Sequence, residues 1–265
     1  MKKTLLLPLL AVVVVARTAA PASPPVFDLA RARTLDLTHP FDDKTPYWPT
    51  ATSGFQLTTV HRGKTPDGYF YSAYSFCAPE HGGTHLDAPS HFAEGGYSAD
   101  AIPLKQLVAP GIVIDVSAGA AADADYRLTV ADVEAWERRN GRVPAGAIAL
   151  VRTGWSSRWP DRKRYLGDDT PGDASRLHFP GVSKEAVALL VERRVAALGI
   201  DTASLDHGPS KDFAAHRVGA AANVPNLENL AHLDQLPETG AWIVALPMKI
   251  GGGSGGPLRA IALLR

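Results

Sequence analysis

Residues 81–92 bring together several metal-binding residue types. The segment reads His-Gly-Gly-Thr-His-Leu-Asp-Ala-Pro-Ser-His-Phe, and it places His81, His85, Asp87 and His91 within eleven positions. In an extended strand, residues two positions apart share a face, so His81, His85 and Asp87 would point the same way. The spacing therefore predicts two imidazoles and a carboxylate gathered on one face of a strand.

A helix explains this segment less well than a strand does. Helical spacing would align His81 with His85 but rotate Asp87 away, and the glycines at 82 and 83 together with Pro89 would interrupt the helix. The strand ends near Pro89, so the alternation does not set the direction of His91. A second alternative is a polar strand that faces solvent and carries its histidines by chance.

Imidazole and carboxylate groups gathered in one place would bind a first-row divalent metal ion, with zinc and manganese as the leading choices. Cysteine takes no part, because the single Cys77 cannot form a cysteine zinc cluster, an internal disulfide or a CxxC redox pair. Cys77 has no activating motif beside it and is expected to be a small buried residue. Thr84 is expected to hydrogen-bond behind the ligands, and the two glycines after His81 are expected to let other groups approach closely.

The first 22 residues are expected to be a cleaved signal peptide. Lys2 and Lys3 precede an apolar run at 5–16, and Ala20-Pro21-Ala22 offers the small residues that signal peptidase reads, with Thr18-Ala19-Ala20 as a second candidate. A membrane span needs about 20 apolar residues, and this run is too short for one.

Residues 23–265 would then form the exported protein, which is expected in the periplasm or outside the cell. Cleavage after Ala22 leaves 24 basic and 27 acidic side chains. This composition argues against a nucleic-acid partner, which usually requires a basic excess. No later run is long and apolar enough to span a membrane, so no membrane contact is expected after cleavage.

Short runs rich in β-branched or aromatic residues predict strands, and periodic segments with capping residues predict helices. The strand runs lie at 34–38, 54–60, 69–76, 111–116, 147–152, 195–200, 242–246 and 257–264. Helices are predicted at 129–139, 183–194 and about 210–222. This pattern indicates a mixed α/β domain with a β-rich front half. The glycine-rich run 251–256 lies between two strand patterns, which favours a hairpin or substrate-side loop over a dinucleotide loop.

The segment at 81–92 resembles the signature of the cyclase family of metal-dependent hydrolases, which includes bacterial kynurenine formamidase and isatin hydrolase. The family pattern is His-x-Gly-Thr-His-x-Asp-x-Pro-x-His-Phe, and every fixed position is matched. Further resemblances lie at 37–40, 47–49, 199–206, 226–230, 245–250 and 257–260, so the likeness runs from about residue 34 to the C-terminus. It implies a single domain of the swivelling β/β/α type over 23–265, assembled as a homodimer or larger homo-oligomer.

The resemblance also implies a set of metal ligands. His81, His85 and Asp87 would bind a first ion, and Asp87 would bridge to a second. His216 resembles the second-metal ligand, and Glu228 resembles the carboxylate that closes the site. The alternatives are a helix-surface histidine for His216 and a solvated strand-edge carboxylate for Glu228. Either one or two Zn²⁺ or Mn²⁺ ions fit this set.

Other residues are implied in catalysis and substrate binding. His91 resembles the family's general acid and base. Trp48 resembles an aromatic residue of the substrate pocket, with a core tryptophan as the alternative. Tyr47 and Phe41 are expected beside Trp48, and His39 would border the same pocket.

Two aspartates and one insertion are left open. Asp201 and Asp206 either orient ligand histidines or cap the turns that follow their strands. Compared with compact kynurenine formamidases, the chain has additional residues around 155–175, which would reshape the pocket or an oligomer contact.

Together these features predict a metal-dependent hydrolase that cleaves a non-peptide C–N bond with metal-activated water. The substrate would be a small aromatic amide, formamide or cyclic amide, as in arylformamidases and isatin hydrolases. Lactones and esters fit the same machinery. An exported metal-binding protein without turnover is the alternative from another class.

Overall fold

The computed structural model describes residues 31–264, and the predicted signal peptide at 1–22 lies outside the described residues. A mixed sheet of eight strands forms its centre, in the order β1-β12-β11-β5-β7-β9-β10-β4. Strand β4 also pairs with β12, so seven of these strands close into a barrel-like ring and β1 adds to its outside. The strands of the sheet are β1 (Arg33–Asp36), β4 (His85–Asp87), β5 (Val108–Asp115), β7 (Ile148–Arg152), β9 (Ala197–Ile200), β10 (Asn226–Glu228), β11 (Ala241–Pro247) and β12 (Gly255–Leu264).

The ring combines parallel and antiparallel pairs. Strands β5, β7, β9 and β10 run parallel to one another, while every other pair in the sheet is antiparallel, including β5 with β11 and β10 with β4. Strand β7 is buried on both faces, as parallel strands usually are. Its Ile148 and Leu150 enter the core inside the ring, and Ala149 and Val151 enter the core under the helices.

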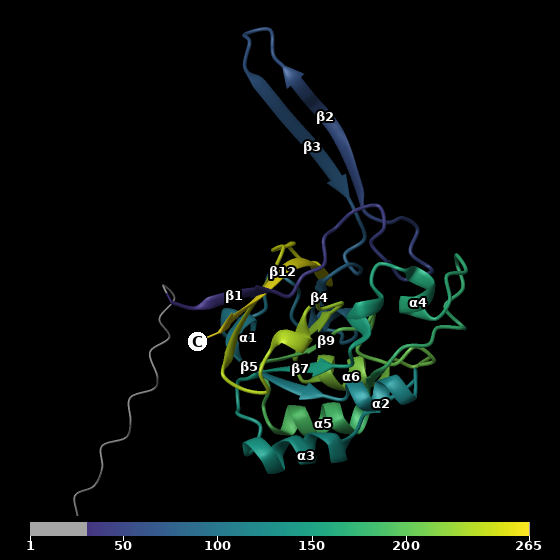
Figure 1. Ribbon diagram of the computed structural model, residues 1–265, viewed down its shortest axis with the longest axis vertical. Helices are drawn as coiled ribbons and strands as arrows, with labels where there is room; N and C mark the ends of the chain where they lie inside the picture. The colour runs from purple at the N-terminus through teal and green to yellow at the C-terminus, as the bar shows by residue number, and fades with distance from the viewer. Residues whose placement is uncertain (1–30, 265) are drawn as a thin grey trace, which may run out of the picture.

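Helices cover one side of the ring. Figure 1 shows α3 (Val130–Asn140) and α5 (Lys184–Glu192) side by side below β5 and β7. The remaining helices are α1 (Leu104–Leu107), α2 (Ser117–Ala122), α4 (Arg162–Leu166) and α6 (Ala214–Ala221), with 3-10 turns η1 (Pro89–His91), η2 (Trp155–Arg158) and η3 (Leu233–Gln235). Within residues 31–264, none of these helices has the length and apolar character that crossing a membrane requires.

Local capping explains where the two longest helices begin. Thr129 accepts a hydrogen bond from the Asp132 backbone, and the Asp132 side chain accepts one from the Thr129 backbone, which completes a capping box before α3. Ser183 accepts a hydrogen bond from the Ala186 backbone before α5. The predicted helices at 129–139 and 183–194 are therefore confirmed, and α6 lies inside the third predicted range.

The predicted strands are also present, and the fold is mixed α/β, as expected. Two local expectations need correction. The strand in the metal-binding segment covers only residues 85–87, and His91 lies on the 3-10 turn that Pro89 begins. Cys77 is exposed rather than buried, because it ends a strand that lies outside the main core.

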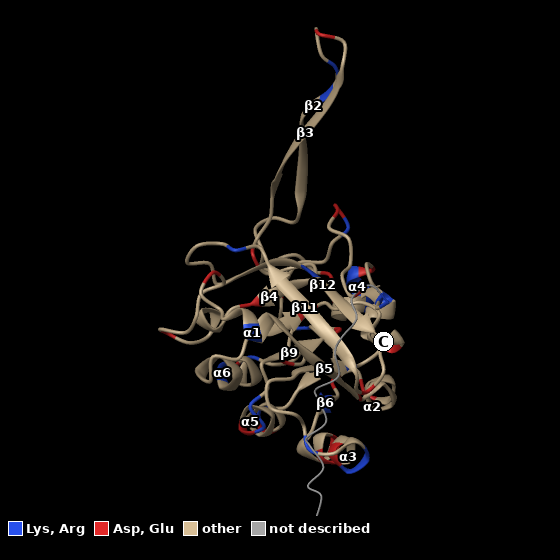
Figure 2. Cartoon of the chain, turned by 90° about the vertical axis from the view of Figure 1, so that its left-hand side faces the viewer, with Lys and Arg blue, Asp and Glu red and all other residues tan. Residues whose placement is uncertain are grey.

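That strand belongs to a hairpin that projects from the body. Strands β2 (Gln56–Lys64) and β3 (Phe70–Cys77) pair only with each other and extend far beyond the ring (Figures 1 and 2). A third, small sheet joins β6 (Arg127–Leu128) and β8 (Gly181–Val182). The hairpin begins and ends close to the segments 46–51 and 79–81, which line the site described next.

Candidate metal centre and active site

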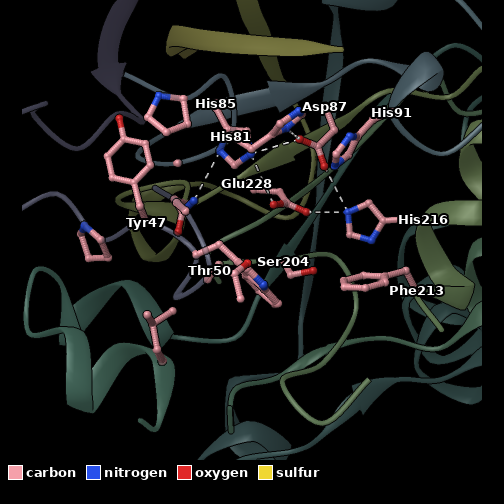
Figure 3. Close-up of a pocket in the computed structure, with 18 of the residues that line it drawn as sticks. Tyr47, Thr50, His81, His85, Asp87, His91, Ser204, Phe213, His216 and Glu228 are labelled. Carbon is pink, nitrogen blue, oxygen red and sulfur yellow. Dashed lines mark hydrogen bonds and ion pairs between the residues drawn. The ribbon is translucent and has the colours of Figure 1, made fainter. Parts of the chain in front are cut away.

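The site forms where strand β4 closes the ring. Strand β4 carries His85 and Asp87, and its antiparallel neighbour β10 carries Glu228 directly opposite His85. Helix α6 supplies His216, and His81 comes from the chain that leads into β4. Side chains from three regions that are distant in sequence therefore meet at one point (Figure 3).

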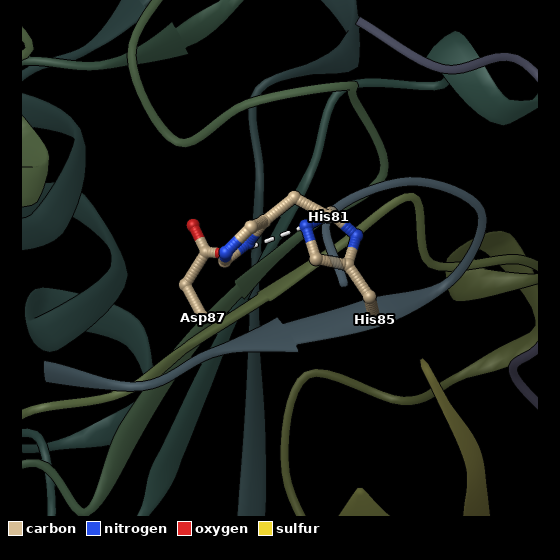
Figure 4. Close-up of side chains that lie close together, drawn as sticks. All are labelled: His81, His85 and Asp87. Carbon is tan, nitrogen blue, oxygen red and sulfur yellow. Dashed lines mark hydrogen bonds and ion pairs between the residues drawn. The ribbon is translucent and has the colours of Figure 1, made fainter. Parts of the chain in front are cut away.

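Asp87 lies between the three histidines. Its Oδ1 is 2.6 Å from His81 Nδ1 and 3.1 Å from His85 Nε2, and both rings turn toward it in Figure 4. Its Oδ2 is 3.1 Å from His216 Nε2, which is also 2.9 Å from Glu228 Oε1. The geometry thus gives two overlapping groups that share Asp87, one with His81 and His85 and one with His216 and Glu228.

Hydrogen bonds from behind orient two of the histidines. The Nδ1 of His85 donates to the carbonyl of Gly83 at 2.9 Å, and the Nδ1 of His216 donates to Asp206 Oδ2 at 2.7 Å. Because Nδ1 of each ring is engaged in this way, Nε2 is the nitrogen that faces Asp87 and Glu228. Asp206 is therefore a partner that orients a ligand histidine, and it also accepts from the backbone N–H groups of Ala215 and His216 at the start of α6.

The buried carboxylates favour positive charge at this point. Burial acts to raise the pKa of Asp87, but hydrogen bonds from His216, His81 and His85 outweigh it and hold that pKa well below its usual value. Burial acts to lower the pKa of His85, but the hydrogen bond and charge of Asp87 and the charge of Glu228 raise it to about 9. Burial also acts to lower the pKa of His216. Contacts with carboxylates, first of all the hydrogen bond to Asp206, outweigh burial and raise that pKa well above its usual value.

These residues fit one or two divalent metal ions. The Nε2 of His85 is buried and, among residues 31–264, faces two carboxylate oxygens, Asp87 Oδ1 at 3.1 Å and Glu228 Oε2 at 3.6 Å. Imidazole nitrogens and carboxylate oxygens are ligands that zinc accepts, and a cation at this position would satisfy His85 and the charge of the carboxylates together.

A cavity of about 360 Å³ opens over the cluster. This volume falls in the range usual for small-molecule sites. Trp48, Phe92 and Phe213 form an aromatic wall, in which the Phe213 ring centre lies 6.1 Å from that of Trp48 and 5.3 Å from that of Phe92. Tyr47 also lines the cavity, so the structure places both Tyr47 and Trp48 where the sequence predicted.

Phe41 and His39 are not brought into this cavity. Both line a neighbouring groove beside Leu246 and Met248. The Phe41 ring packs against Gly83, and a side chain at that glycine would collide with it, just as one at Gly82 would collide with Tyr47. The two motif glycines therefore admit aromatic rings, and Phe41 packs against the segment 81–87 from outside the cavity.

His91 lies at the edge of the cavity. Its ring stacks on His81 with 3.8 Å between ring centres, and no described residue hydrogen-bonds its imidazole. Desolvation lowers the pKa of His91 to about 4, against the opposing charge of Asp87 and with the charges of the neighbouring histidines adding to the effect. Its imidazole is therefore neutral near pH 7 and free to accept a proton from a molecule in the cavity.

The additional segment around 155–175 reaches the base of the site. Leu166 of α4 lines the cavity, and the Tyr165 hydroxyl donates to Asn229 Oδ1 at 2.9 Å. Asn229 in turn donates to the Gly83 carbonyl at 2.7 Å, the same oxygen that accepts from His85. This segment therefore shapes the pocket, which was one of the two roles left open for it.

Asp201 has a different role from Asp206. Its carboxylate accepts from the backbone N–H and hydroxyl of Thr153 and from the backbone N–H of Gly154, so it fixes the turn after β7. It contacts no histidine of the cluster. Asp201 is therefore a structural aspartate, but the turn it holds follows the neighbouring strand β7 and not its own strand β9.

Phe213, Ser204 and Asn229 are among the cavity residues that sequence reasoning did not assign. Ser204 and Asn229 lie inside segments already recognised by resemblance, so position in the motif was an available signal. Phe213 lies outside every segment recognised by resemblance, so no sequence signal pointed to it. Its backbone has a φ of 48° in the left-handed region, which costs a non-glycine residue about 1–2 kcal/mol, and the aromatic contacts with Trp48 and Phe92 hold it there.

Known proteins match the chain in sequence and in structure. A family model, Cyclase ("Putative cyclase"), matches residues 35–207. An isatin hydrolase of Roseibium aggregatum is 36% identical over 206 residues, which are 75% of this chain and 77% of that protein. A kynurenine formamidase of Salinibacter ruber is 28% identical over 227 residues, which are 86% of this chain and 95% of that protein. The solved structure of isatin hydrolase A from Ralstonia solanacearum has a TM-score of 0.81 and 36% identity, over 93% of this chain and 100% of that one.

Asp206→Asn is expected to weaken Zn²⁺ binding by about 10–100-fold, because the neutral amide no longer holds the Nδ1 proton of His216 in place. A competition titration against a chromophoric chelator measures this affinity, and a thermal melt checks that the variant is folded. Asp125→Asn is the matched control, since Asp125 contacts the exposed His178 at 2.8 Å, away from the site. Equal Zn²⁺ affinity in Asp206→Asn and the unchanged protein contradicts the role given to Asp206.

Proposed function

Because the chain belongs to the Cyclase family of metal-dependent hydrolases, we propose that it opens the ring of a small aromatic cyclic amide. It is a metal-dependent hydrolase of non-peptide C–N bonds, like its isatin hydrolase and kynurenine formamidase relatives. The higher identity to isatin hydrolase favours a cyclic amide over an N-formyl amine. The observation that carries the proposal is the convergence of three histidines and two carboxylates under an aromatic cavity.

We assign the metal ligands as two sets that share one carboxylate. His81, His85 and Asp87 would hold one Zn²⁺ or Mn²⁺ ion, and Asp87, His216 and Glu228 would hold a second. Such an ion lowers the pKa of water from 15.7 to about 7 and polarises a carbonyl oxygen. Asp206 and the Gly83 carbonyl keep the Nε2 atoms of His216 and His85 directed at the site.

His91 acts as general base and then as general acid. Its neutral imidazole takes a proton as water attacks the carbonyl carbon, and it returns that proton to the leaving nitrogen. Stacking on His81 places the ring beside the cluster, and no described residue competes for its nitrogens. This free imidazole is also what argues against a purely metal-storing protein, which has no need of a proton carrier.

The aromatic wall selects a flat substrate. Trp48 and Phe213 offer apolar ring surfaces on the side of the cavity that faces the cluster. A planar fused ring bearing the amide buries its apolar area against them while its carbonyl faces the histidines. Lactones and esters of the same shape fit this arrangement as secondary substrates.

We further propose that the protein works outside the cytoplasm. This rests on the sequence of residues 1–22, whose cleavage leaves the whole described domain intact. The assignment of the domain to the swivelling β/β/α type is likewise a proposal, supported by the closed mixed sheet with helices on one side.

The protein without residues 1–22, loaded with Zn²⁺ or Mn²⁺, is expected to hydrolyse isatin faster than N-formylkynurenine or simple cyclic imides. Absorbance assays measure each rate. Removal of the metal with a chelator should abolish hydrolysis, and returning the ion should restore it. Activity that persists after complete chelation, or in a His85→Ala/Asp87→Ala double variant, contradicts the metal-dependent mechanism.

His91→Ala is expected to lower the rate of amide hydrolysis by about 100-fold or more, because the proton transfers lose their carrier. The metal content, measured by mass spectrometry of the purified protein, should stay close to that of the unchanged protein. His178→Ala serves as the control, since His178 is an exposed histidine paired with Asp125. Loss of metal in parallel with activity speaks against His91 as a proton carrier.

The projecting hairpin supports the proposal of a homo-oligomer. Leu57 lies opposite Phe76 in the register, and Phe70, Tyr74 and Phe76 alternate along β3, so these four share one face. Between 44% and 64% of each of these side chains is exposed. Figure 2 shows that charged residues on the hairpin lie mainly toward its tip. A two-stranded hairpin is marginally stable in water, and an apolar face of this extent marks a protein contact.

The occupant we propose for this face is a second copy of the chain. Each copy also carries an apolar groove of about 720 Å³ next to the base of the hairpin, and its Leu246 and Met248 are each 45% exposed. In a two-fold dimer, the hairpin of one copy would pack in the groove of the other, and the contact would occur twice. Both surfaces would be buried without any further partner.

The hairpin variant Leu57→Ser/Phe76→Ser is expected to be monomeric at micromolar concentration, where the unchanged protein is a dimer. Light scattering coupled to size exclusion measures the mass. Thr58→Ala/Ser75→Ala is the control, because these residues pair on the opposite face of the same hairpin. A monomeric unchanged protein, or a dimer that survives in the Leu57→Ser/Phe76→Ser variant, refutes this interface.

A further inference from the structure

The glycine-rich loop between β11 and β12 lies against His81. Ser254 of this loop has its Oγ 2.9 Å from His81 Nε2 and 2.6 Å from Glu80 Oε2. The backbone N–H of Ser254 also donates to Glu80 Oε2 at 3.0 Å. Ser254 therefore links a carboxylate to a histidine of the proposed metal centre.

The direction of each hydrogen bond follows from the chemistry of the three groups. A carboxylate only accepts, so the single hydroxyl hydrogen of Ser254 goes to Glu80. The Ser254 oxygen must then accept from His81, which places the imidazole hydrogen on Nε2. His81 Nδ1, which hydrogen-bonds Asp87 at 2.6 Å, is then the nitrogen that would bind the metal ion in place of the hydrogen it shares with Asp87.

We infer that Ser254 and Glu80 are positioning residues that direct Nδ1 of His81 into the metal centre. The inference rests on the proposed role of His81 as a ligand. In this arrangement the second nitrogen of His81 is hydrogen-bonded to Ser254, just as that of His85 is bonded to the Gly83 carbonyl and that of His216 to Asp206. A ligand histidine whose second nitrogen is hydrogen-bonded keeps its ring orientation and its tautomer.

The glycines of the loop are explained by the same contacts. A side chain at Gly255 would place its Cβ 2.7 Å from His81 Cε1 and 2.5 Å from the Leu86 carbonyl oxygen. At Gly253 it would lie 2.7 Å from Glu80 Oε1. Glycine at these two positions lets the loop backbone approach closely enough for Ser254 to reach both Glu80 and His81.

A second set of contacts holds the loop without touching the histidine. Asp100 accepts from the Gly252 backbone N–H at 3.0 Å and from the Ser98 hydroxyl at 2.6 Å. The Gly253 carbonyl accepts from the Ala99 backbone N–H at 2.8 Å. Ser98 thus makes a serine–carboxylate bond of the same length as that of Ser254, and it provides a matched control for an effect on the loop alone.

The test measures binding of Zn²⁺ alone, without substrate, by competition with a chromophoric chelator. Ser254→Ala is expected to weaken Zn²⁺ binding by about 10–100-fold, and Glu80→Ala should weaken it too, because the freed serine hydrogen can then turn toward His81. Ser254→Thr restores the hydroxyl and should recover most of the affinity. Ser98→Ala should bind Zn²⁺ like the unchanged protein.

A second measurement follows the Nε2 hydrogen of His81 in the Zn²⁺-loaded protein. Nitrogen-15-edited NMR should show a slowly exchanging hydrogen on His81 Nε2, and this protection should be lost in Ser254→Ala and kept in Ser98→Ala. Unchanged Zn²⁺ affinity and unchanged protection of this hydrogen in Ser254→Ala, or an equal loss in Ser98→Ala, overturns the inference. Normal Zn²⁺ binding without hydrolysis of any amide counts against the proposed function alone.

Discussion

The buried charge of Asp87 is the constraint on which the site and the closure of the sheet depend. A carboxylate removed from water is costly unless it is paired and hydrogen-bonded, and Asp87 meets this need through His81, His85 and His216. Its strand, β4, pairs with β10 on one side and β12 on the other. The strand that closes the ring is therefore also the strand that brings the ligands together.

Because β4 pairs with a strand on each side, different elements supply different residues of the cluster. The β10 side supplies Glu228 and the β12 side supplies the glycine-rich loop, while α6 adds His216 from outside the ring. Each histidine has one nitrogen near Asp87 and the other bonded to an acceptor, which comes from another segment for His81 and His216 and from the neighbouring Gly83 for His85. These hydrogen bonds orient the rings before any ligand binds, as catalytic electrostatics requires.

The pocket and the assembly surfaces grow from the same scaffold. The segment 46–51 lines the cavity and leads into the hairpin, and Pro79 follows the hairpin back to the cavity wall. The Phe55 ring stacks on Phe76 at the hairpin base and contacts Phe41, which in turn packs on Gly83. A partner bound along the hairpin would therefore be connected to the segment 81–87 through this series of ring contacts.

Local patterns were enough to predict most elements and the ligand residues. Local patterns predicted the strands of the ring except β10, the helices α3 and α5, and a longer helical range that contains α6, and the spacing at 81–87 predicted a shared face for its two histidines and aspartate. Resemblance added His216 and Glu228, which the structure places within 2.9 Å of each other. Phe41, Cys77 and Phe213 were misjudged or missed, because their surroundings come from segments remote in sequence.

The amino-acid sequence alone determined the chemistry available to the site, namely imidazoles and carboxylates without thiolates. Which nitrogen of His81 and of His216 faces the ion was decided only by the tertiary structure, since the acceptors that hold the other nitrogen, at Ser254 and Asp206, reach their places only when the sheet closes and α6 docks.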